Sequence, residues 1–276
     1  MRRTIGLSSG MVLLVWAVGC VVPYEDTLEQ EAVRKPTQQA AVQGLVWMFP
    51  GVVGQPWELG PAYRGLRDGG VEREYRVFQW DTAWLDFPEH LADYVRNVFQ
   101  AAEVASQIAA YKAQYPDRPV ILVGHSAGGF MAVKVAELLP ADVRLQRVVI
   151  AQPSISPTYD LTAALRHIDG QLVSLYCPSD WFLSGVFSEF AGTMDRQYEA
   201  TAGKDGFDEE AAVPDAALRT KLVQVPWSPL WRAYGHEGDH MSILEYAWNR
   251  YIVAPFVLGA GETGDGPTES GAVTGA

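Results

Sequence analysis

Between residues 44 and 258, short apolar runs alternate with longer stretches in which apolar residues recur every three or four positions. The short runs are rich in Val, Ile, Leu and aromatic residues and mostly do not alternate with polar ones. This is expected of parallel strands that are covered on both faces. The pattern predicts six strands, at residues 45–49, 75–80, 120–123, 147–151, 172–177 and 222–225.

The clearest helical pattern covers residues 91–115 and ends at Pro116. Its recurring apolar positions are Leu91, Tyr94, Val95, Val98, Ala102, Ala105, Ile108 and Ala109. Further helices are expected at 58–66, 127–139 and 242–255. Because strands and helices alternate, we expect right-handed crossovers and an α/β fold, a doubly wound and mostly parallel sheet of about six strands flanked by helices.

The first twenty residues have the layout of a secretory signal. Arg2 and Arg3 precede an apolar segment at 11–18, and small residues lead to Cys20. The apolar segment is shorter than the roughly 20 residues that span a bilayer. Its Gly-Cys end resembles a bacterial lipoprotein signal, which implies secretion across the inner membrane to the cell envelope or periplasm and a lipid anchor on Cys20. Because Ala17 stands where Leu is usual, a plain cleaved signal or a buried Cys20 remains an alternative.

The chain is therefore expected to have four parts. These are a signal peptide (1–19), a flexible polar tether (20–43), one α/β domain (44–258) and a disordered tail (259–276). The tail has almost no large apolar residues with which to offset the entropy of ordering. The 276 residues, 48% of them hydrophobic, are enough to bury one large core.

Charge and cysteine content narrow the range of partners. With 33 Asp plus Glu against 21 Lys plus Arg, the formal net charge is −12, which argues against nucleic acid as a partner. If Cys20 carries a lipid, Cys177 has no disulfide partner, and its apolar surroundings predict a buried, unreactive thiol. No His or Cys cluster has metal-ligand spacing, and no cofactor is expected.

A G-x-S-x-G motif is formed by Gly124, His125, Ser126, Ala127 and Gly128. It follows the predicted strand 120–123 and opens the helix 127–139, which is the setting of a nucleophile elbow. The glycines let strand and helix approach closely, and the helix N-terminus favours developing negative charge. The alternative is a glycine-rich turn with a capping serine.

With this elbow, the chain resembles the serine esterases and lipases of the α/β-hydrolase superfamily over about residues 44–256. The resemblance implies a catalytic triad in the chain order Ser, Asp or Glu, His. This order leaves His236 and His240 as candidate bases. His240 is the first choice, because it precedes the last amphipathic segment, and His236 is the alternative base. His125 is expected to point into the surroundings of the sheet without a role in the site.

Asp180, three residues past the predicted strand 172–177, is the first choice of acid. A carboxylate there could accept the Nδ1 proton of His240. Asp160 and Asp169 compete, but they have the sequence contexts of a helix cap and a turn. The long gap to His240 indicates an insertion at about 181–217, which either covers the site or is an irregular excursion with one helix.

Two backbone N–H groups are needed to hold the oxyanion of an acyl-transfer site. Ala127 follows the nucleophile and supplies one. Val52, in the turn at Pro50 and Gly51 after the first strand, is the candidate for the other. The His-Gly pattern usual in the family is absent at this turn, where Phe49 precedes Pro50 and Gly51.

Together these features predict a serine hydrolase that cleaves carboxylic esters through an acyl-enzyme intermediate. Ser126, Asp180 and His240 would form its triad, and its substrate would be a small-molecule or lipid ester. A serine peptidase or a thioesterase could use the same triad. A non-catalytic hydrolase-like binding domain is the alternative from a different class, but the intact order of the three residue types favours an enzyme.

Overall fold

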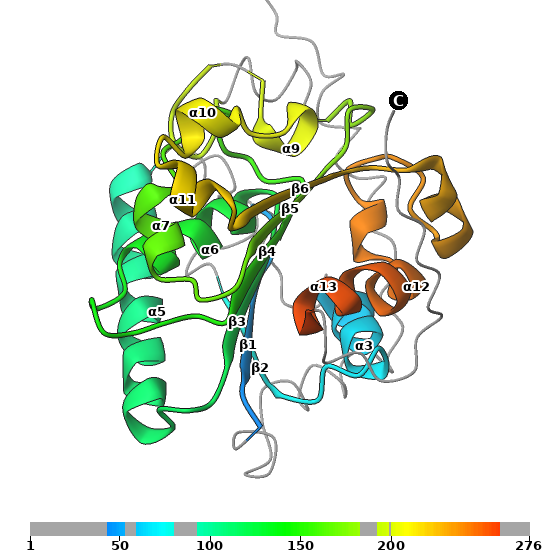
Figure 1. Cartoon of the computed structure of the whole chain (residues 1–276). Coiled ribbons are helices and arrows are strands. Elements are labelled where there is room, and N and C mark those ends of the chain that lie inside the picture. Colours follow the sequence, from blue (N-terminus) through cyan, green and yellow to red (C-terminus); the bar gives the residue numbers. More distant parts are fainter. Residues whose placement is uncertain (1–42, 53–58, 80–92, 183–191, 199, 260–276) are drawn as a thin grey trace, which may run out of the picture.

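The computed structural model describes residues 43–52, 59–79, 93–182, 192–198 and 200–259. All six expected strands pair in parallel in one sheet of order β2-β1-β3-β4-β5-β6 (Figure 1). The strands are β1 Leu45–Phe49, β2 Glu74–Val77, β3 Val120–His125, β4 Arg147–Ala151, β5 Leu172–Tyr176 and β6 Leu222–Pro226. The predicted α/β fold with about six strands is confirmed.

The strand ends differ from the prediction by a few residues. β3 continues through Gly124 and His125, because both still pair with β4. β2 begins at Glu74, and Trp80 of its predicted range lies outside the described residues. β6 includes Pro226, which an edge strand tolerates because one side of its backbone needs no partner.

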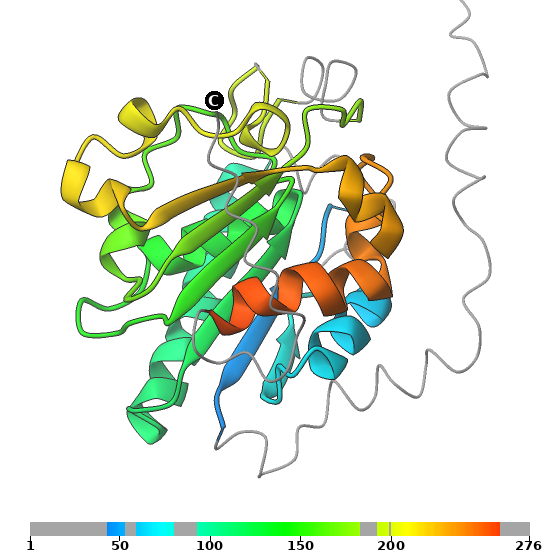
Figure 2. The same cartoon turned by 45° about the vertical axis from the view of Figure 1, so that its right-hand side comes forward.

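Helices cover both faces of the sheet (Figures 1 and 2). One face carries α5 (Tyr94–Gln114), α6 (Ala127–Glu137) and α7 (Thr162–Arg166), and the other carries α3 (Gly60–Asp68), α12 (Tyr246–Trp248) and α13 (Ala254–Leu258). Each face has its own core of buried apolar side chains. The sheet is therefore buried on both sides, as its continuous apolar strands predict.

The chain leaves the neighbouring strands β1 and β3 toward opposite faces, because α3 follows β1 and α6 follows β3 (Figure 1). Such a reversal opens a crevice at the carboxyl ends of the two strands, where doubly wound proteins bind ligands. Ser126 follows β3 at this place, and Gly51 and Val52 follow β1.

The buried face of α5 differs from the predicted one. Asp93 caps the helix, its Oδ1 accepting from Arg96 N at 3.0 Å, and the helix ends before Pro116. Val95, expected in the apolar stripe, is 62% exposed, and Leu91 lies outside the described residues. Since the helix carries many small residues, its apolar periodicity alone does not determine which face packs. The buried residues are Asn97, Ala101, Val104, Ala105, Ile108 and Tyr111.

The helix predicted at 242–255 is instead a series of short pieces. A 3-10 turn (Ser242–Leu244), α12, a π-helix (Asn249–Val253) and α13 follow one another. Asn249 Nδ2 donates to the carbonyls of Ile243 at 2.7 Å and Glu245 at 2.8 Å, and Glu245 O also accepts the backbone bond from Asn249 N at 3.1 Å. Pro255 lies in the first turn of α13, where its missing N–H needs no partner.

The predicted insertion at 181–217 contains more helix than expected. Its described part includes α9 (Ala202–Asp205), α10 (Glu209–Ala212) and the start of α11 (Ala216–Arg219), and residues 183–191 and 199 lie outside it. Ala202 N donates to Ile155 O at 2.7 Å and Gly203 N to Pro153 O at 3.0 Å. This segment therefore packs on the chain that follows β4.

The predicted signal peptide (1–19), tether (20–43) and tail (259–276) lie outside the described residues, apart from Gln43 and Gly259. In the described part of the chain, no helix combines the length and the hydropathy needed to cross a membrane.

Helix α3 and the C-terminal helices meet at two glycines without side chains between them. A Cβ on Gly65 would lie 2.4 Å from Tyr246 O and 2.8 Å from Asn249 Cβ. A Cβ on Gly69 would lie 2.5 Å from the Cβ of Ala254. The segment that follows His240 in the chain is therefore packed closely on α3.

We predict that Gly65→Ala lowers the free energy of unfolding by about 1–3 kcal/mol, because the added methyl overpacks a backbone contact. Gly60→Ala is the matched control in the same helix, since a Cβ there would meet nothing within 4 Å. It should change stability by less than about 1 kcal/mol. Chemical denaturation of both variants measures the difference, and equal stabilities would contradict the close approach of the helices.

Candidate active site

Ser126 lies in a strained turn between β3 and α6. Its backbone has φ 54° and ψ −123°, a conformation that residues with a Cβ rarely adopt. A Cβ on Gly124 would lie 2.4 Å from Gly128 O, and one on Gly128 would lie 2.1 Å from Phe49 O. Only glycine fits at both places. The two glycines of the motif thus permit the close approach of strand and helix that the sequence predicts.

His240 bridges Ser126 and Asp180. Its Nε2 lies 2.9 Å from Ser126 Oγ, and its Nδ1 lies 2.7 Å from Asp180 Oδ2. The three side chains are buried, with exposed fractions of 6% for Ser126, 5% for His240 and 0% for Asp180. When Nδ1 donates its proton to the carboxylate, the lone pair of Nε2 faces the serine hydroxyl. The structure therefore brings together the three residues selected as first choices from the sequence.

Asp180 accepts further hydrogen bonds besides the one from His240. Its Oδ2 accepts from Gln152 Nε2 at 2.6 Å, and its Oδ1 accepts from Phe182 N at 3.0 Å. Gln152 Nε2 also donates to Asp239 O at 3.2 Å. The sequence interpretation missed Gln152. The available signal was a polar residue directly after the apolar strand β4, at the same edge of the sheet as Ser126.

The loop that carries Asp180 is bonded to the loop that carries His240. Ser179 Oγ donates to Gly238 O at 2.9 Å, and Cys177 Sγ donates to the same oxygen at 3.3 Å. Cys177 is a free and buried cysteine, as predicted, and burial raises the pKa of its thiol, so it stays protonated. These bonds fix the distance between the carboxylate and the imidazole.

The ring of His240 lies between two other rings. Its centroid is 4.8 Å from that of Phe182, at an interplanar angle of 22°, and 4.7 Å from that of His125. The pKa of His125 lies well below its usual range, mainly because the side chain is buried and secondly because His240 is close, so His125 is neutral. His125 was expected to point into the surroundings of the sheet, and its ring instead contacts that of His240. Because β3 extends through His125, this side chain shares the face of Ile121 and Val123, on which His240 lies.

His236, the alternative base, lies in a different environment. Its ring packs 4.8 Å from that of Trp248 and 5.9 Å from that of Trp231, and its Nδ1 accepts from Gly238 N at 3.2 Å. Burial lowers the pKa of His236 to about 4. Since His240 and not His236 contacts Ser126 Oγ, the structure assigns His236 a packing role.

Both candidate oxyanion donors lie on segments next to Ser126. A Cβ on Gly51 would be 3.5 Å from Ser126 Cβ, so the loop that carries Val52 passes beside the serine. Ala127 is the first residue of α6, where a backbone N–H has no carbonyl partner within its own helix.

The two competing acids have the local roles that their sequences indicate. Asp160 Oδ1 accepts from the N–H of Thr162, the first residue of α7, at 2.8 Å, although Leu161 occupies the cap position itself. Asp169 lies in the turn before β5, with its N–H donating to Leu145 O at 2.9 Å. Asp180 is the carboxylate that bonds His240.

Two other sequence predictions concern ligands. Among the described residues, no group of three or more His, Cys, Asp or Glu side chains could hold a metal ion. Cys20, the predicted lipidation site, lies outside the described residues.

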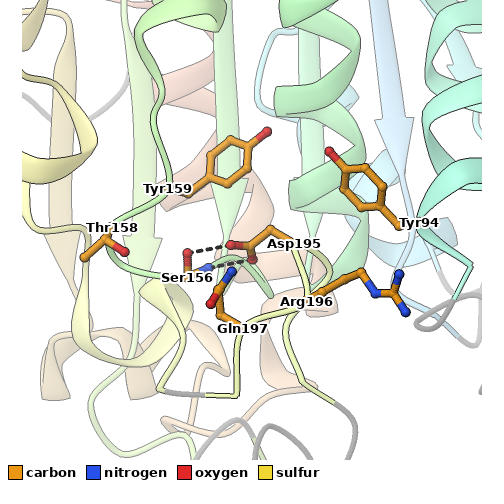
Figure 3. A pocket seen from close by; sticks show the side chains of 7 residues that line it. All are labelled: Tyr94, Ser156, Thr158, Tyr159, Asp195, Arg196 and Gln197. Carbon is orange, nitrogen blue, oxygen red and sulfur yellow. Dashed lines mark hydrogen bonds between the residues drawn. The ribbon is translucent and has the colours of Figure 1, made fainter.

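A hollow of about 360 Å³ lies between the N-terminal end of α5 and the chain that precedes α7 (Figure 3). Asp195 closes one side, because its carboxylate accepts from Ser156 N at 2.9 Å and from Ser156 Oγ at 2.5 Å. The triad residues are not part of its lining, which consists of Tyr94, Ser156, Thr158, Tyr159, Asp195, Arg196 and Gln197.

Comparison with known proteins gives a family and several structural relatives. The model of the alpha/beta hydrolase family matches residues 41–273. No curated protein matches the sequence.

Three solved structures illustrate the likeness. LpqC, a poly(3-hydroxybutyrate) depolymerase from Bordetella parapertussis, is 18% identical, with a TM-score of 0.49 over 78% of this chain and 80% of that chain. Aspergillus fumigatus lipase B is 10% identical, with a TM-score of 0.48 over 81% of this chain and 54% of that chain. The NocB thioesterase domain, in covalent complex with a fluorophosphonate nocardicin G analog, is 15% identical. Its TM-score is 0.46 over 80% of this chain and 96% of that chain. The activities in these names belong to those proteins.

The low pKa of His236 has a consequence for stability. The unfolded chain protonates this residue near pH 6.5, but the folded protein does so only near pH 4, so the unfolded state binds more protons in between. Neutral His236 therefore contributes on the order of 3 kcal/mol to the free energy of unfolding above pH 6.5. This contribution is lost as the pH falls toward 4.

We predict that His236→Gln is less stable than the wild type at pH 7 but loses less of its stability on acidification to pH 4.5. Urea denaturation of both proteins at the two pH values measures this difference. Equal losses in the two proteins would contradict a neutral, buried His236.

Proposed function

The chain belongs to the alpha/beta hydrolase family, and we propose that it is a serine hydrolase that cleaves carboxylic esters through an acyl-enzyme intermediate. The observation that supports this proposal is the His240 ring, which is bonded through Nε2 to Ser126 and through Nδ1 to Asp180. In the proposal Ser126 is the nucleophile, His240 is the general base and acid, and Asp180 orients His240.

The first step forms the acyl-enzyme. As Ser126 Oγ attacks the carbonyl carbon, its proton passes to His240 Nε2. The carbonyl π electrons move onto the oxygen, and the N–H groups of Val52 and Ala127 stabilise the resulting oxyanion. Asp180 stabilises the imidazolium and keeps the proton of Nδ1 directed toward itself.

Collapse of this intermediate breaks the bond between the carbonyl carbon and the alcohol oxygen. The proton on His240 Nε2 passes to the departing alcohol. A water molecule then attacks the acyl carbon and gives its proton to His240, and the second tetrahedral intermediate releases the acid and restores Ser126.

The surroundings of His240 favour the positive charge that it carries between these steps. The face of Phe182 lies close to the imidazole ring and attracts a cation. His125 is neutral and adds no repulsion. Because Asp180 is fully buried, little water screens its attraction to the imidazolium.

We predict that a fluorophosphonate probe labels the wild type and fails to label Ser126→Ala, because the probe needs the activated oxygen. Ser174→Ala is the matched control, since it removes another buried hydroxyl, from strand β5 of the same sheet, and should label normally. His240→Ala should lower kcat on a p-nitrophenyl ester by roughly 10³-fold or more. Gel-based labelling and initial rates measure these effects.

If the probe failed to label the wild type, a non-catalytic hydrolase-like binding domain would be the better description of this protein. Full activity in His240→Ala would reject His240 as the base. Faster turnover of a matched thioester or anilide than of the ester would assign the triad to a thioesterase or peptidase.

We further propose that Cys20 carries a lipid that anchors the enzyme in the cell envelope after secretion. This proposal rests on the order of charged, apolar and small residues before Cys20. A lipid on Cys20 would place the esterase at a membrane surface and in reach of lipid esters.

In a bacterium that lipidates secreted proteins, we expect the wild type in the membrane fraction with a diacylglyceryl addition on Cys20. Cys20→Ser should lose both, because serine has no thiol to modify. Cys177→Ser is the control for cysteine removal and should stay in the membrane fraction. Intact mass spectrometry of the fractions provides the measurement, and an unmodified wild type would overturn the proposal.

A further inference from the structure

Three neighbouring strands each lead to one polar side chain of the site. Ser126 follows β3, Gln152 follows β4 and Asp180 lies in the loop after β5. Because β4 lies between the other two strands, Gln152 is the group that separates the proposed nucleophile from the proposed acid at the edge of the sheet. Its side chain is 1% exposed.

We infer that Gln152 is a positioning residue, which holds the Asp180 carboxylate and the loop of His240 in place for the reaction. The inference rests on the proposed function, and it assigns to Gln152 no contact with the reacting atoms.

The amide of Gln152 donates hydrogen bonds to two loops at once. Its Nε2 donates one hydrogen to Asp180 Oδ2 at 2.6 Å and the other toward Asp239 O at 3.2 Å. A primary amide nitrogen has two hydrogens, so both are taken. Carboxylate and carbonyl oxygens only accept, so the nitrogen and not the oxygen of the amide must face them. One side chain therefore links the acid to the residue that precedes His240.

The backbone of Gln152 is held in a strained conformation. Its φ is 44°, and among the described residues only two other non-glycine residues, Ser126 and Arg196, have a positive φ. Strain of this kind persists where the surroundings enforce it, and it gathers at functional sites. Here Gln152 N donates to Leu175 O at 2.7 Å, and a Cβ on Gly203 would lie 2.4 Å from the carbonyl carbon of Gln152.

The bond from Gln152 affects the charge that His240 meets. Asp180 Oδ2 accepts from Gln152 and from His240 Nδ1, so the two donors share its negative charge. Without the amide, more of the negative charge on Asp180 Oδ2 would be left for the imidazolium that forms on His240, so the carboxylate would attract it more strongly. In the described residues, Asp180, His125 from β3 and Asp239 of its own loop are the titratable groups that face or adjoin His240.

Fluorophosphonate labelling tests this inference, because the rate of labelling needs no knowledge of the natural substrate. Gln152→Met keeps the length of the side chain and removes both N–H groups. We expect it to react roughly 10- to 100-fold more slowly than the wild type, the usual effect of losing a hydrogen bond to a charged group. Gln224→Met is the matched control, since Gln224 bonds the N–H and C=O of Phe207 on the far edge of the sheet, and it should react like the wild type.

The pH profile of labelling separates positioning from mere stability. In Gln152→Met, the acid limb should move to higher pH, because the carboxylate then holds the imidazolium more strongly and the free base appears only at higher pH. Gln152→Leu, which also lacks both N–H groups, should move that limb in the same direction. Circular dichroism checks that the variants are folded, and Gln152→Leu alone carries the test if Gln152→Met is not.

Labelling of Gln152→Met at the wild-type rate with an unmoved acid limb would overturn the inference and leave the proposed function intact, provided that Ser126→Ala stays unlabelled. An unmoved limb in a folded Gln152→Leu would overturn it as well. Failure of the wild type to label would instead reject the proposed function.

Discussion

A single buried imidazole connects the carboxyl ends of β3 and β5, and it must meet two oxygen atoms at hydrogen-bond distance. Contacts of 2.9 Å to Ser126 Oγ and 2.7 Å to Asp180 Oδ2 tolerate little movement of either loop. Features that are far apart in the sequence serve this requirement. Gly124 and Gly128 permit the strained turn of Ser126, and the bonds to Gly238 O join the two loops. The close packing of α3 supports the segment after His240.

The same arrangement controls where charge resides. A carboxylate with no exposed surface is stable only when donors surround it, and Asp180 accepts from a side-chain amide, a backbone N–H and an imidazole. Burial keeps the neighbouring His125 and His236 neutral at pH 7. His240 is the one of these three imidazoles that contacts Ser126 Oγ, which is the position that general base catalysis requires.

The parts of this structure that depend on local sequence were predictable. Continuous apolar runs identified the six strands, and the spacing of Gly124, Ser126 and Gly128 identified the elbow. The chain order that the family resemblance implies left His236 beside His240 as a possible base, and the place of Asp180 after a strand made it the first choice of acid. Features that depend on how distant segments are aligned with one another were not predictable from the sequence. The place of His125 beside His240 follows from the length of β3, and the role of Gln152 follows from the neighbouring strand ends. The broken C-terminal helix depends on how the Asn249 side chain bonds two carbonyls.

The central claim is that His240 presents an unprotonated Nε2 to Ser126 because Asp180 holds the proton on Nδ1. Nitrogen-15 NMR of the histidine-labelled protein, at a pH where His240 is neutral, reports directly which ring nitrogen carries the proton. The account predicts the Nδ1–H form for His240, with a proton resonance that is lost in Asp180→Ala. A neutral His240 protonated on Nε2 would contradict it, because such a ring has no lone pair with which to accept the proton of Ser126.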